Sequence, residues 1–433
     1  MLRLVMTVLF VLLLVNPAVA QWEMPEFLIL MWRHYDIEDD EAKVQALAKT
    51  GCNVVMLPSN TLELCRKYGL KLLVMDASPN VASRLSGDPA VWGYRLIDEP
   101  TDDPICQKKN NIFGGPKTLF ADRGKLDMFP ALAEEVKAYR KADPHHLPYI
   151  NMLNRDGDFL RRFIRIVSPD LLSFDYYQWF WGSAGHFPTL EYHREAALAA
   201  KIPLVRFLTA NASGNIGGWD GDRSPPSDNL QKLRQSVYTS LAYGVKGIEW
   251  FNARLTGMFV PGTTELGPCG KDVAAINAEL RKLGPILMKL RSVDVFHTRP
   301  LPRGTREVPK DYWVHALSGR SSGIVMGIFK DDKNNDFIMV ANRNVNHERQ
   351  ALLHFMEPVK EVNKFNKRTG EWESLTINDD VIDVIENNRI YRWALAIQRF
   401  VHGSDFPINK LRVGTCVEFS LSPGDGELLR VKR

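Results

Sequence analysis

The regular alternation of apolar, strand-like runs with helical segments constrains the fold of this chain more than any other feature of its sequence. Short runs rich in β-branched and aromatic residues are typical of buried strands, whereas apolar spacings of three and four are typical of helices. Eight strand-like runs precede residue 290, at 27–32, 53–57, 71–75, 91–99, 148–153, 171–177, 203–208 and 247–251. Helices are expected at 39–49, 61–68, 128–142, 158–167, 190–200, 230–243 and 271–290.

Eight strand-like runs that alternate with helical segments in this length predict an α/β fold of the (β/α)8 TIM-barrel type, which usually takes about 250 residues. The alternative is an open, doubly wound sheet. Such a sheet usually carries a glycine-rich phosphate loop after its first strand, whereas here Arg33-His34-Tyr35 follows. The sequence therefore favours a closed barrel, in which catalytic groups are expected at the C-terminal ends of the strands.

After residue 290 the pattern changes to short strand-like runs separated by turn sequences. These runs are 323–329, 337–341, 351–355, 359–363, 390–393 and 416–421. They predict a small all-β sandwich. We therefore expect a barrel over residues 21–297 and a C-terminal β-sandwich domain over 298–433.

The N-terminus has the pattern of a signal peptide. Arg3 precedes an apolar run, 4–15, and Ala18-Val19-Ala20 fits a cleavage site before Gln21. We expect residues 1–20 to be removed and the protein to be secreted or periplasmic; the alternative is an uncleaved membrane anchor. No later segment has about 18 consecutive apolar residues, so no stable membrane insertion is expected after cleavage.

Charge and cysteine content exclude several classes of function. The formal net charge is only +4, from 55 basic and 51 acidic residues, which does not favour nucleic acid as a partner. The five cysteines lack the paired spacing of a zinc site, and no metal or organic cofactor is expected. Cys106 and Cys269 fall in segments expected on one face of the barrel, so they are the predicted disulfide pair; free thiols are the alternative.

The fourth strand-like run ends in two carboxylates, Asp98 and Glu99, followed by Pro100, which cannot continue a ladder. A carboxyl group among Trp92, Tyr94 and Pro100 would be desolvated, which raises its pKa and lets it donate a proton. We therefore predict Glu99 as a catalytic acid/base, with a structural ion pair as the alternative. Because successive strand residues point to opposite faces, Asp98 is expected to point away and to support the site.

Polar strand ends suggest a carbohydrate site, since amides and carboxylates bind hydroxyl groups and aromatic rings pack against sugar faces. Glycoside hydrolysis needs two carboxyl groups. For the second, Glu249 and Asp175 are the leading candidates, and Asp76, Asp220 or Asp222 remain open. The candidate substrate-binding residues are Arg33, His34, Asp76, Asp98, Asn151, Tyr176, Tyr177, Trp179, Trp219, Trp250 and Asn252. Packing of the aromatic segment 176–181 on the long insertion 101–125 is the structural alternative.

Three segments, 92–100, 171–177 and 238–248, resemble bacterial (β/α)8 glycoside hydrolases of clan A, the broad β-galactosidase-like group. The resemblance implies that the acid/base glutamate ends the fourth strand, which matches Glu99, although Asp98 replaces the usual asparagine. It also implies a nucleophilic glutamate at the end of the seventh strand, where this chain has Thr209 instead. Glu249 would occupy that position only if the strand count were shifted by one.

These observations predict an exported glycoside hydrolase that cleaves β-linked oligo- or polysaccharides by a retaining, two-carboxylate mechanism. The rival is a non-catalytic carbohydrate-binding barrel with a degenerate site, suggested by Thr209 at the end of the seventh strand. A sugar lyase or a transglycosidase is a weaker alternative.

Overall fold

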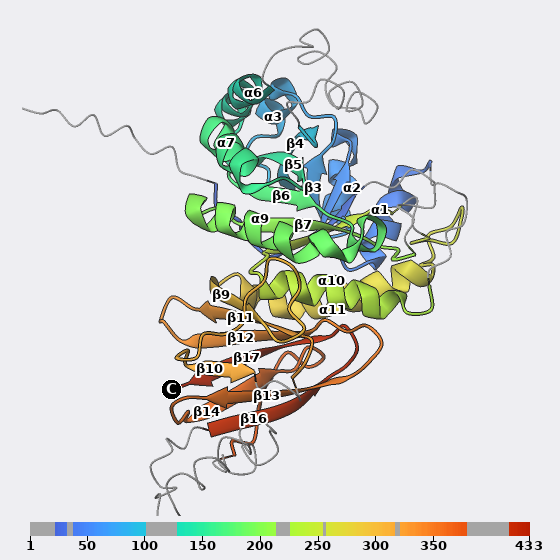
Figure 1. Ribbon diagram of the computed structural model, residues 1–433. Coiled ribbons are helices and arrows are strands. Elements are labelled where there is room, and N and C mark those ends of the chain that lie inside the picture. Colours follow the sequence, from blue (N-terminus) through green and yellow to red (C-terminus); the bar gives the residue numbers. More distant parts are fainter. Residues whose placement is uncertain are drawn as a thin grey trace, which may run out of the picture.

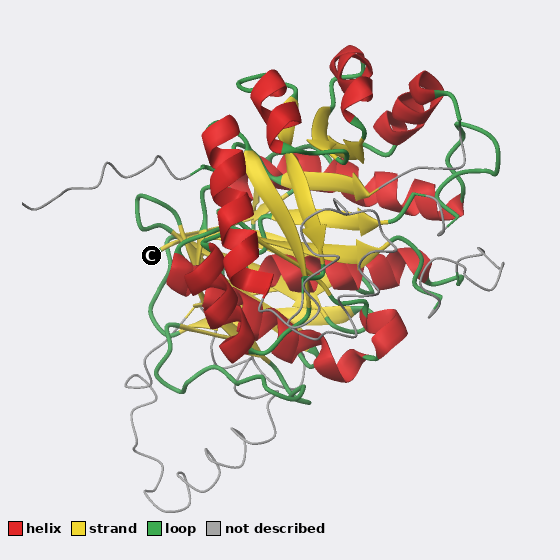
Figure 2. Ribbon diagram, turned by 90° about the horizontal axis from the view of Figure 1, so that it is seen from above, coloured by secondary structure: helices red, strands yellow, loops and turns green. Residues whose placement is uncertain are grey.

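The computed structural model describes residues 22–32, 38–100, 128–213, 226–253, 257–316, 321–378 and 415–433. Within them, eight parallel strands pair in sequence order and close into a barrel, because β1 pairs with both β2 and β8. Figure 2 shows the strands surrounded by helices. The predicted TIM barrel and the strand count are confirmed. Predictions on residues 1–20, 101–125 and 390–393 lie outside the described residues, as do those on Arg33, His34, Cys106, Trp219, Asp220 and Asp222.

The barrel elements follow the expected ranges closely. The strands are β1 (Leu28–Trp32), β2 (Val54–Leu57), β3 (Lys71–Val74), β4 (Val91–Asp98), β5 (Leu147–Leu153), β6 (Leu172–Asp175), β7 (Leu204–Thr209) and β8 (Gly247–Phe251). The helices are α1 (Asp40–Lys49), α2 (Leu62–Lys67), α3 (Pro79–Leu85), α6 (Met128–Ala142), α7 (Gly157–Val167), α8 (Gln178–Trp181), α9 (His186–Ala200), α10 (Asn229–Ala242) and α11 (Pro268–Leu287). Sequence reasoning missed α3, whose start is marked by the N-cap Ser78 and by Pro79 in the first turn.

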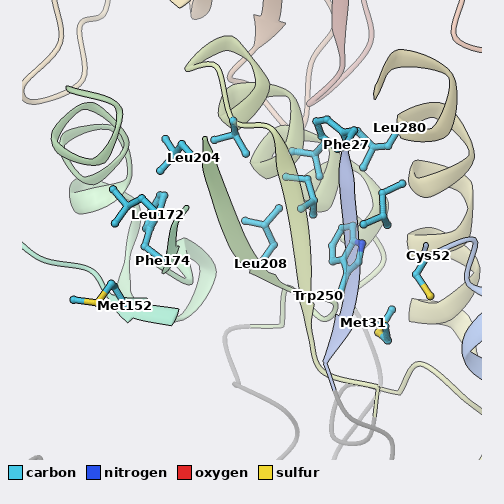
Figure 3. Packing of buried hydrophobic residues seen from close by; sticks show 14 of the residues in the cluster. Phe27, Met31, Cys52, Met152, Leu172, Phe174, Leu204, Leu208, Trp250 and Leu280 are labelled. Atoms are coloured by element: carbon cyan, nitrogen blue, oxygen red, sulfur yellow. The ribbon is translucent and has the colours of Figure 1, made fainter. Parts of the chain in front are cut away.

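Alternation along the strands divides the apolar residues into two layers. Leu28, Leu30 and Trp32 face the barrel interior, whereas Ile29 and Met31 pack outward against the helices. Figure 3 shows part of the outer layer. Close packing of neighbouring strands requires small residues at some positions: a Cβ added to Gly247 would lie 2.5 Å from Leu28 Cβ.

An irregularity in β4 changes which residues reach the interior. The register of β4 against β5 shifts between Arg95 and Ile97, so that Arg95 lies opposite Tyr149 and Asp98 lies opposite Asn151. Such bulges re-aim side chains and are frequent near active sites. As a result, both Arg95 and Asp98 lie on the same side of the sheet as the inward-facing residues of β5.

The C-terminal region is a sandwich of two antiparallel sheets. One has the order β10-β13-β16 and the other the order β15-β14-β17-β12-β11-β9. Their bounds are β9 (Arg291–His297), β10 (Val314–Ala316), β11 (Ile324–Lys330), β12 (Asp336–Asn342), β13 (Arg349–Phe355), β14 (Glu361–Phe365), β15 (Trp372–Ser374), β16 (Thr415–Leu421) and β17 (Gly426–Lys432). The predicted β-sandwich is confirmed, and it includes Arg291–His297, a segment that the sequence placed at the end of the barrel.

The sandwich packs on the barrel through α10 and α11, which lie between the two parts in Figure 1. Glycines permit close approach at this contact. A side chain at Gly327 of β11 would overlap the backbone of Ala242, and one at Gly426 of β17 would meet Tyr238. Apolar residues of the larger sheet belong to the same cluster as the outer layer of the barrel, so the two domains share one continuous core.

The predicted disulfide is not formed. Cys269 is a buried free thiol near the start of α11, where its sulfur faces Asn229 at the start of α10. Cys106, its expected partner, lies outside the described residues. Among the described residues, no helix is long and apolar enough to cross a membrane.

Candidate functional site

The candidate site lies at the C-terminal ends of β4, β5 and β6, with Asn151 at its centre. The Asn151 amide nitrogen Nδ2 lies 3.0 Å from Asp98 Oδ1 and 3.5 Å from Asp175 Oδ2. Asn151 and Asp175 face the same interior because their strands are in register, with Asn151 opposite Ser173 and Leu153 opposite Asp175. Three adjacent strands thus bring two carboxylates to one amide.

Glu99 joins this group because of its backbone conformation. Its φ is +48°, in the left-handed region that residues with a side chain rarely adopt. Its N–H donates to the Asn151 carbonyl at 2.8 Å, which holds the turn in place. The Glu99 side chain is half-buried and interacts by a hydrogen bond with Asp175. A left-handed residue costs about 1–3 kcal/mol, and such strain is typical of functional sites.

The expectation that Asp98 points away from Glu99 is therefore wrong. The bulge in β4 and the left-handed turn at Glu99 together bring both side chains towards Asp175, where simple alternation would have separated them. Asp98 also lies near a buried cation, since an Arg95 guanidinium nitrogen lies 3.9 Å from its Oδ2. Arg95 is itself buried over the Trp32 ring.

Burial dominates the electrostatics of Glu99 and Asp175. Asp175 is only 3% exposed, and desolvation, followed by the charge of Glu99, holds its pKa well above the usual range. Desolvation also raises the pKa of Glu99, and the charge of Asp98 raises it further, while the hydrogen bond to Asp175 and the charge of Arg155 lower it. Two interacting carboxyls in such a place titrate as a pair, and the first proton is lost more easily than the second.

Glu249 lies deeper in the barrel. The structure confirms that it belongs to the eighth strand, so the strand count is not shifted, and β7 ends in Thr209. The Glu249 side chain is fully buried and binds Tyr149 OH at 2.7 Å and Ser173 Oγ at 2.6 Å. Burial raises its pKa to about 8. Its two oxygens are both engaged by these hydroxyl groups and its side chain has no exposed surface among the described residues, so it is poorly placed to attack a substrate.

Aromatic side chains border the site after β6. Tyr177 is buried, and its pKa is raised by desolvation and then by the charges of Asp175 and Asp98, which places it beside the carboxylates. The Trp181 ring lies 5.3 Å from the Tyr177 ring and is 41% exposed, and Phe180 is 47% exposed. Tyr176 packs in the outer layer and donates to the Gly182 carbonyl.

Two predicted tryptophans, Trp179 and Trp250, turn away from this site. Trp179 turns towards α10, where its Nε1 donates to Ser236 Oγ at 3.0 Å. Trp250 points outward and donates to Asn277 of α11 at 2.9 Å. Asp76 accepts hydrogen bonds from the backbone and hydroxyl of Ser59. Asn252 is buried directly after β8.

Sequence reasoning missed three side chains around the site: Arg95, Tyr149 and Ser173. A signal existed for two of them. Tyr149 and Ser173 stand two residues before Asn151 and Asp175 on their strands, which is the spacing of residues that share a face. The position of Arg95 depends on the bulge in β4, which local sequence does not reveal. Among the described residues, no group of three or more His, Cys, Asp or Glu side chains could hold a metal ion.

Comparison with known proteins yields structural likenesses alone. No family model and no curated protein sequence matches the chain. The GH51 arabinofuranosidase from Xanthomonas axonopodis pv. citri is similar at 10% identity and a TM-score of 0.42, over 90% of this chain and 89% of that chain. The catalytic core of xylanase A is similar at 13% identity and a TM-score of 0.41, over 58% of this chain and 98% of that chain.

A GH128 endo-β-1,3-glucanase from Amycolatopsis mediterranei is similar at 13% identity and a TM-score of 0.36, over 57% of this chain and 98% of that chain. These three proteins are glycoside hydrolases by name, the class that the sequence motifs resemble. At these identities and TM-scores, the likeness carries no argument about the substrate or the mechanism of this chain. The fold itself rests on the closed pairing of β1 to β8.

Proposed function

We propose that this protein is an exported glycoside hydrolase that cleaves β-linked glycans with retention of configuration. Glu99 and Asp175 are the two carboxyl groups of the mechanism, with Glu99 as the general acid/base. The observation that carries the proposal is the interacting, desolvated pair that these residues form at the mouth of the barrel. Export rests on the signal-like segment 1–20, and β-linkage rests on the resemblance of the sequence motifs.

The closeness of the two carboxyls supports retention. Retaining enzymes hold their carboxyl groups about 5–5.5 Å apart, whereas inverting enzymes leave about 6.5–9.5 Å for a water molecule. A side-chain hydrogen bond between Glu99 and Asp175 leaves no room for that water. The pair therefore favours direct attack by one carboxylate over attack by water.

In the first step, Asp175 attacks the anomeric carbon while Glu99 donates its proton to the glycosidic oxygen, and the C–O bond breaks to release an alcohol. In the second, Glu99 as carboxylate takes a proton from water, which attacks the same carbon and releases Asp175. Burial raises the pKa of Asp175, so the shared proton must pass to Glu99 before attack. The positive charge that develops at the anomeric carbon then stabilises the ionised Asp175 in the transition state.

The surroundings fit a sugar substrate. The Asn151 amide and Asp98 offer hydrogen bonds to hydroxyl groups, and the exposed rings of Trp181 and Phe180 offer flat apolar faces beside them. Pockets that combine a few placed polar groups with aromatic rings are typical of such ligands. The exposed rings lie outside the carboxylate pair, which suits a glycan longer than one sugar.

A panel of β-linked glycans with detection of released reducing ends tests this proposal. The wild type is expected to hydrolyse at least one member, and proton NMR of the first product should show the anomeric configuration of the substrate. Azide should rescue Asp175→Gly as the glycosyl azide of opposite configuration, and should not rescue Glu249→Gly. Rescue of Glu249→Gly instead would contradict the assignment.

The rival of a carbohydrate-binding barrel keeps one supporting observation, which is Thr209 at the end of β7. Binding of a glycan by the wild type without any released reducing end would favour that rival. Inverted product would contradict the retaining mechanism while leaving the hydrolase assignment in place.

A further inference from the structure

The hydrogen bonds around Glu249 form a chain that runs from the barrel interior to the candidate site. Glu249 Oε1 accepts from Tyr149 OH at 2.7 Å, and its Oε2 lies 2.6 Å from Ser173 Oγ. Ser173 Oγ also lies 3.0 Å from Asn151 Oδ1. The other end of the same Asn151 amide, Nδ2, faces Asp98 and Asp175.

Counting protons along this chain distinguishes two states. Ser173 has a single hydroxyl proton, and it lies close to two acceptors, Glu249 Oε2 and Asn151 Oδ1. If Glu249 is ionised, Ser173 donates to it, and Asn151 Oδ1 loses this donor. If Glu249 is neutral, its Oε2–H donates to Ser173, and Ser173 donates to Asn151. Tyr149 OH also lies 2.9 Å from Ser173 Oγ, so the chain has four contacts. The neutral state supplies protons for three of them, and the ionised state for two.

We propose that Glu249 is a positioning residue which, as a neutral carboxylic acid, orients the Asn151 amide through Ser173 and so holds Asp175 in place. Rotation about χ2 of asparagine, which has two roughly equivalent orientations, would exchange the oxygen and nitrogen ends of the amide. A donor on Oδ1 prevents this exchange, and Nδ2 then stays directed at Asp98 and Asp175. This assignment rests on the proposed function, since it concerns the geometry of the same carboxylate pair.

Burial supports the neutral state independently. Glu249 is fully buried, and the pKa of its carboxyl is raised to about 8, mainly by desolvation. At neutral pH the group therefore keeps its proton. A buried carboxyl that stays protonated in order to donate a hydrogen bond is a known use of such a site.

The substitution Glu249→Gln separates a positioning role from nucleophilic attack. The Gln amide can donate to Ser173 and accept from Tyr149, so the variant is expected to keep kcat within about tenfold of wild type. Loss of a nucleophile, in contrast, costs about 10³-fold or more. Glu249→Leu and Ser173→Ala, which interrupt the chain, are expected to lower kcat by about tenfold to a hundredfold with little change in KM.

Trp250→Phe is a matched control, because Trp250 is adjacent on β8 and points to the opposite face, away from the site. It should alter the unfolding midpoint and leave kcat unchanged. If Glu249→Gln lost more than 10³-fold in kcat while keeping the wild-type unfolding midpoint, Glu249 would be a nucleophile and the positioning role would be overturned. In that case the glycoside hydrolase proposal itself would stand.

A second measurement needs no activity. Infrared difference spectroscopy of the full chain at pH 7 should show a protonated-carboxyl C=O band in wild type that Glu249→Gln removes and Asp175→Asn retains. This result would support the neutral donor even if no glycan were hydrolysed. A wild-type spectrum from which Glu249→Gln removes no protonated-carboxyl band would overturn it.

Discussion

The interior and the mouth of the barrel each hold a buried carboxyl group, Glu249 and Asp175, but the groups that surround these two carboxyls differ. Glu249 is 0% exposed and Asp175 is 3% exposed, and desolvation is the main cause of the raised pKa of both. Glu249 is surrounded by two hydroxyl groups, whereas Asp175 faces a second carboxyl, Glu99. A raised pKa therefore does not by itself mark a catalytic group; a carboxyl partner at the mouth does.

Removal of either carboxyl of the pair should have the largest effect. Glu99→Gln is expected to lower kcat by about 10²–10⁴-fold, because proton transfer is lost. Asp175→Asn is expected to lower it by about 10³-fold or more, because covalent attack is lost. Both variants should unfold at the wild-type temperature or above it, since a carboxyl that is costly to charge in the folded state becomes a neutral amide. Steady-state kinetics and thermal unfolding measure the two quantities.

A fully active Glu99→Gln variant would show that Glu99 is a structural group. The carboxyls at the mouth would then differ no more in function than in burial from Glu249 in the interior. Glycan binding by the inactive variants, measured by calorimetry, is the control that separates lost chemistry from lost binding.

The next largest effect is expected on the free energy of unfolding, through the buried carboxyl of Glu249. The folded protein keeps the Glu249 proton up to a pH of about 8, whereas the unfolded chain loses it near 4.5. The stabilisation is complete below pH 4.5 and is lost as the pH rises to 8, by about 1.4 kcal/mol per pH unit within that window. Glu249→Gln has no such proton, so the free energy of unfolding of wild type relative to this variant should fall between pH 5 and pH 8.

Chemical denaturation of both proteins at several pH values tests this expectation. Parallel pH profiles would mean that Glu249 is ionised in the folded protein. Trp250→Phe, which removes a neighbouring side chain on β8 without a titratable group, should keep the pH dependence of the wild type.

The fold was more predictable from the sequence than the site, for physical reasons that particular residues show. Buried parallel strands are continuous apolar runs, and therefore the eight barrel strands were recognisable without knowledge of their partners. Glu99, Asp175 and Asn151 were predicted as site residues because strand ends collect at one face of a barrel, and the structure brings the three side chains together. The sequence did not predict that Asp98 and Glu99 both point towards Asp175, because this depends on a register shift of β4 against β5 and on the left-handed backbone of Glu99.

The directions in which the aromatic side chains point could not be predicted from the sequence either. Trp179 and Trp181 are two positions apart on the single turn of α8, and this spacing turns one towards α10 and leaves the other exposed. Trp250 and Glu249 are adjacent on β8 and therefore point to opposite sides of the strand. To decide which of two neighbouring side chains points to the site, one must know which face of the helix or strand is turned to it, and the amino-acid composition does not determine this.

The two tryptophans of α8, Trp179 and Trp181, should differ in their effect on substrate binding. Trp181→Ala should raise KM by about tenfold, since stacking on a sugar ring buries apolar area worth about 1.5 kcal/mol, and kcat should change little. Trp179→Ala is the matched control: it should lower the unfolding temperature, because the hydrogen bond to Ser236 and the packing on α10 are lost, without raising KM. Equal KM values for both variants would remove Trp181 from the substrate site.

The smallest effect is expected from the third carboxylate at the mouth. Desolvation is the main cause of the raised pKa values of Glu99 and Asp175, and the charge of Asp98 raises both further. Asp98→Asn removes that charge and keeps an oxygen that can accept from Asn151 Nδ2. Both pKa values should therefore fall, and both limbs of the profile of kcat/KM against pH should move to lower pH, by less than about one unit.

Asp76→Asn is the control, because the Asp76 carboxylate accepts hydrogen bonds from Ser59 and is not part of the pair of Glu99 and Asp175. This variant should leave both limbs of the profile of kcat/KM against pH unchanged. The sign of the shift is the decisive quantity for Asp98. A charge that raises the pKa of a carboxyl pair must shift its profile downward when it is removed, whereas a residue that only holds Asn151 would lower kcat/KM equally at every pH. A uniform loss would thus assign Asp98 to the supporting structure of the mouth, and a downward shift would make it part of the electrostatics that keep a proton in the pair.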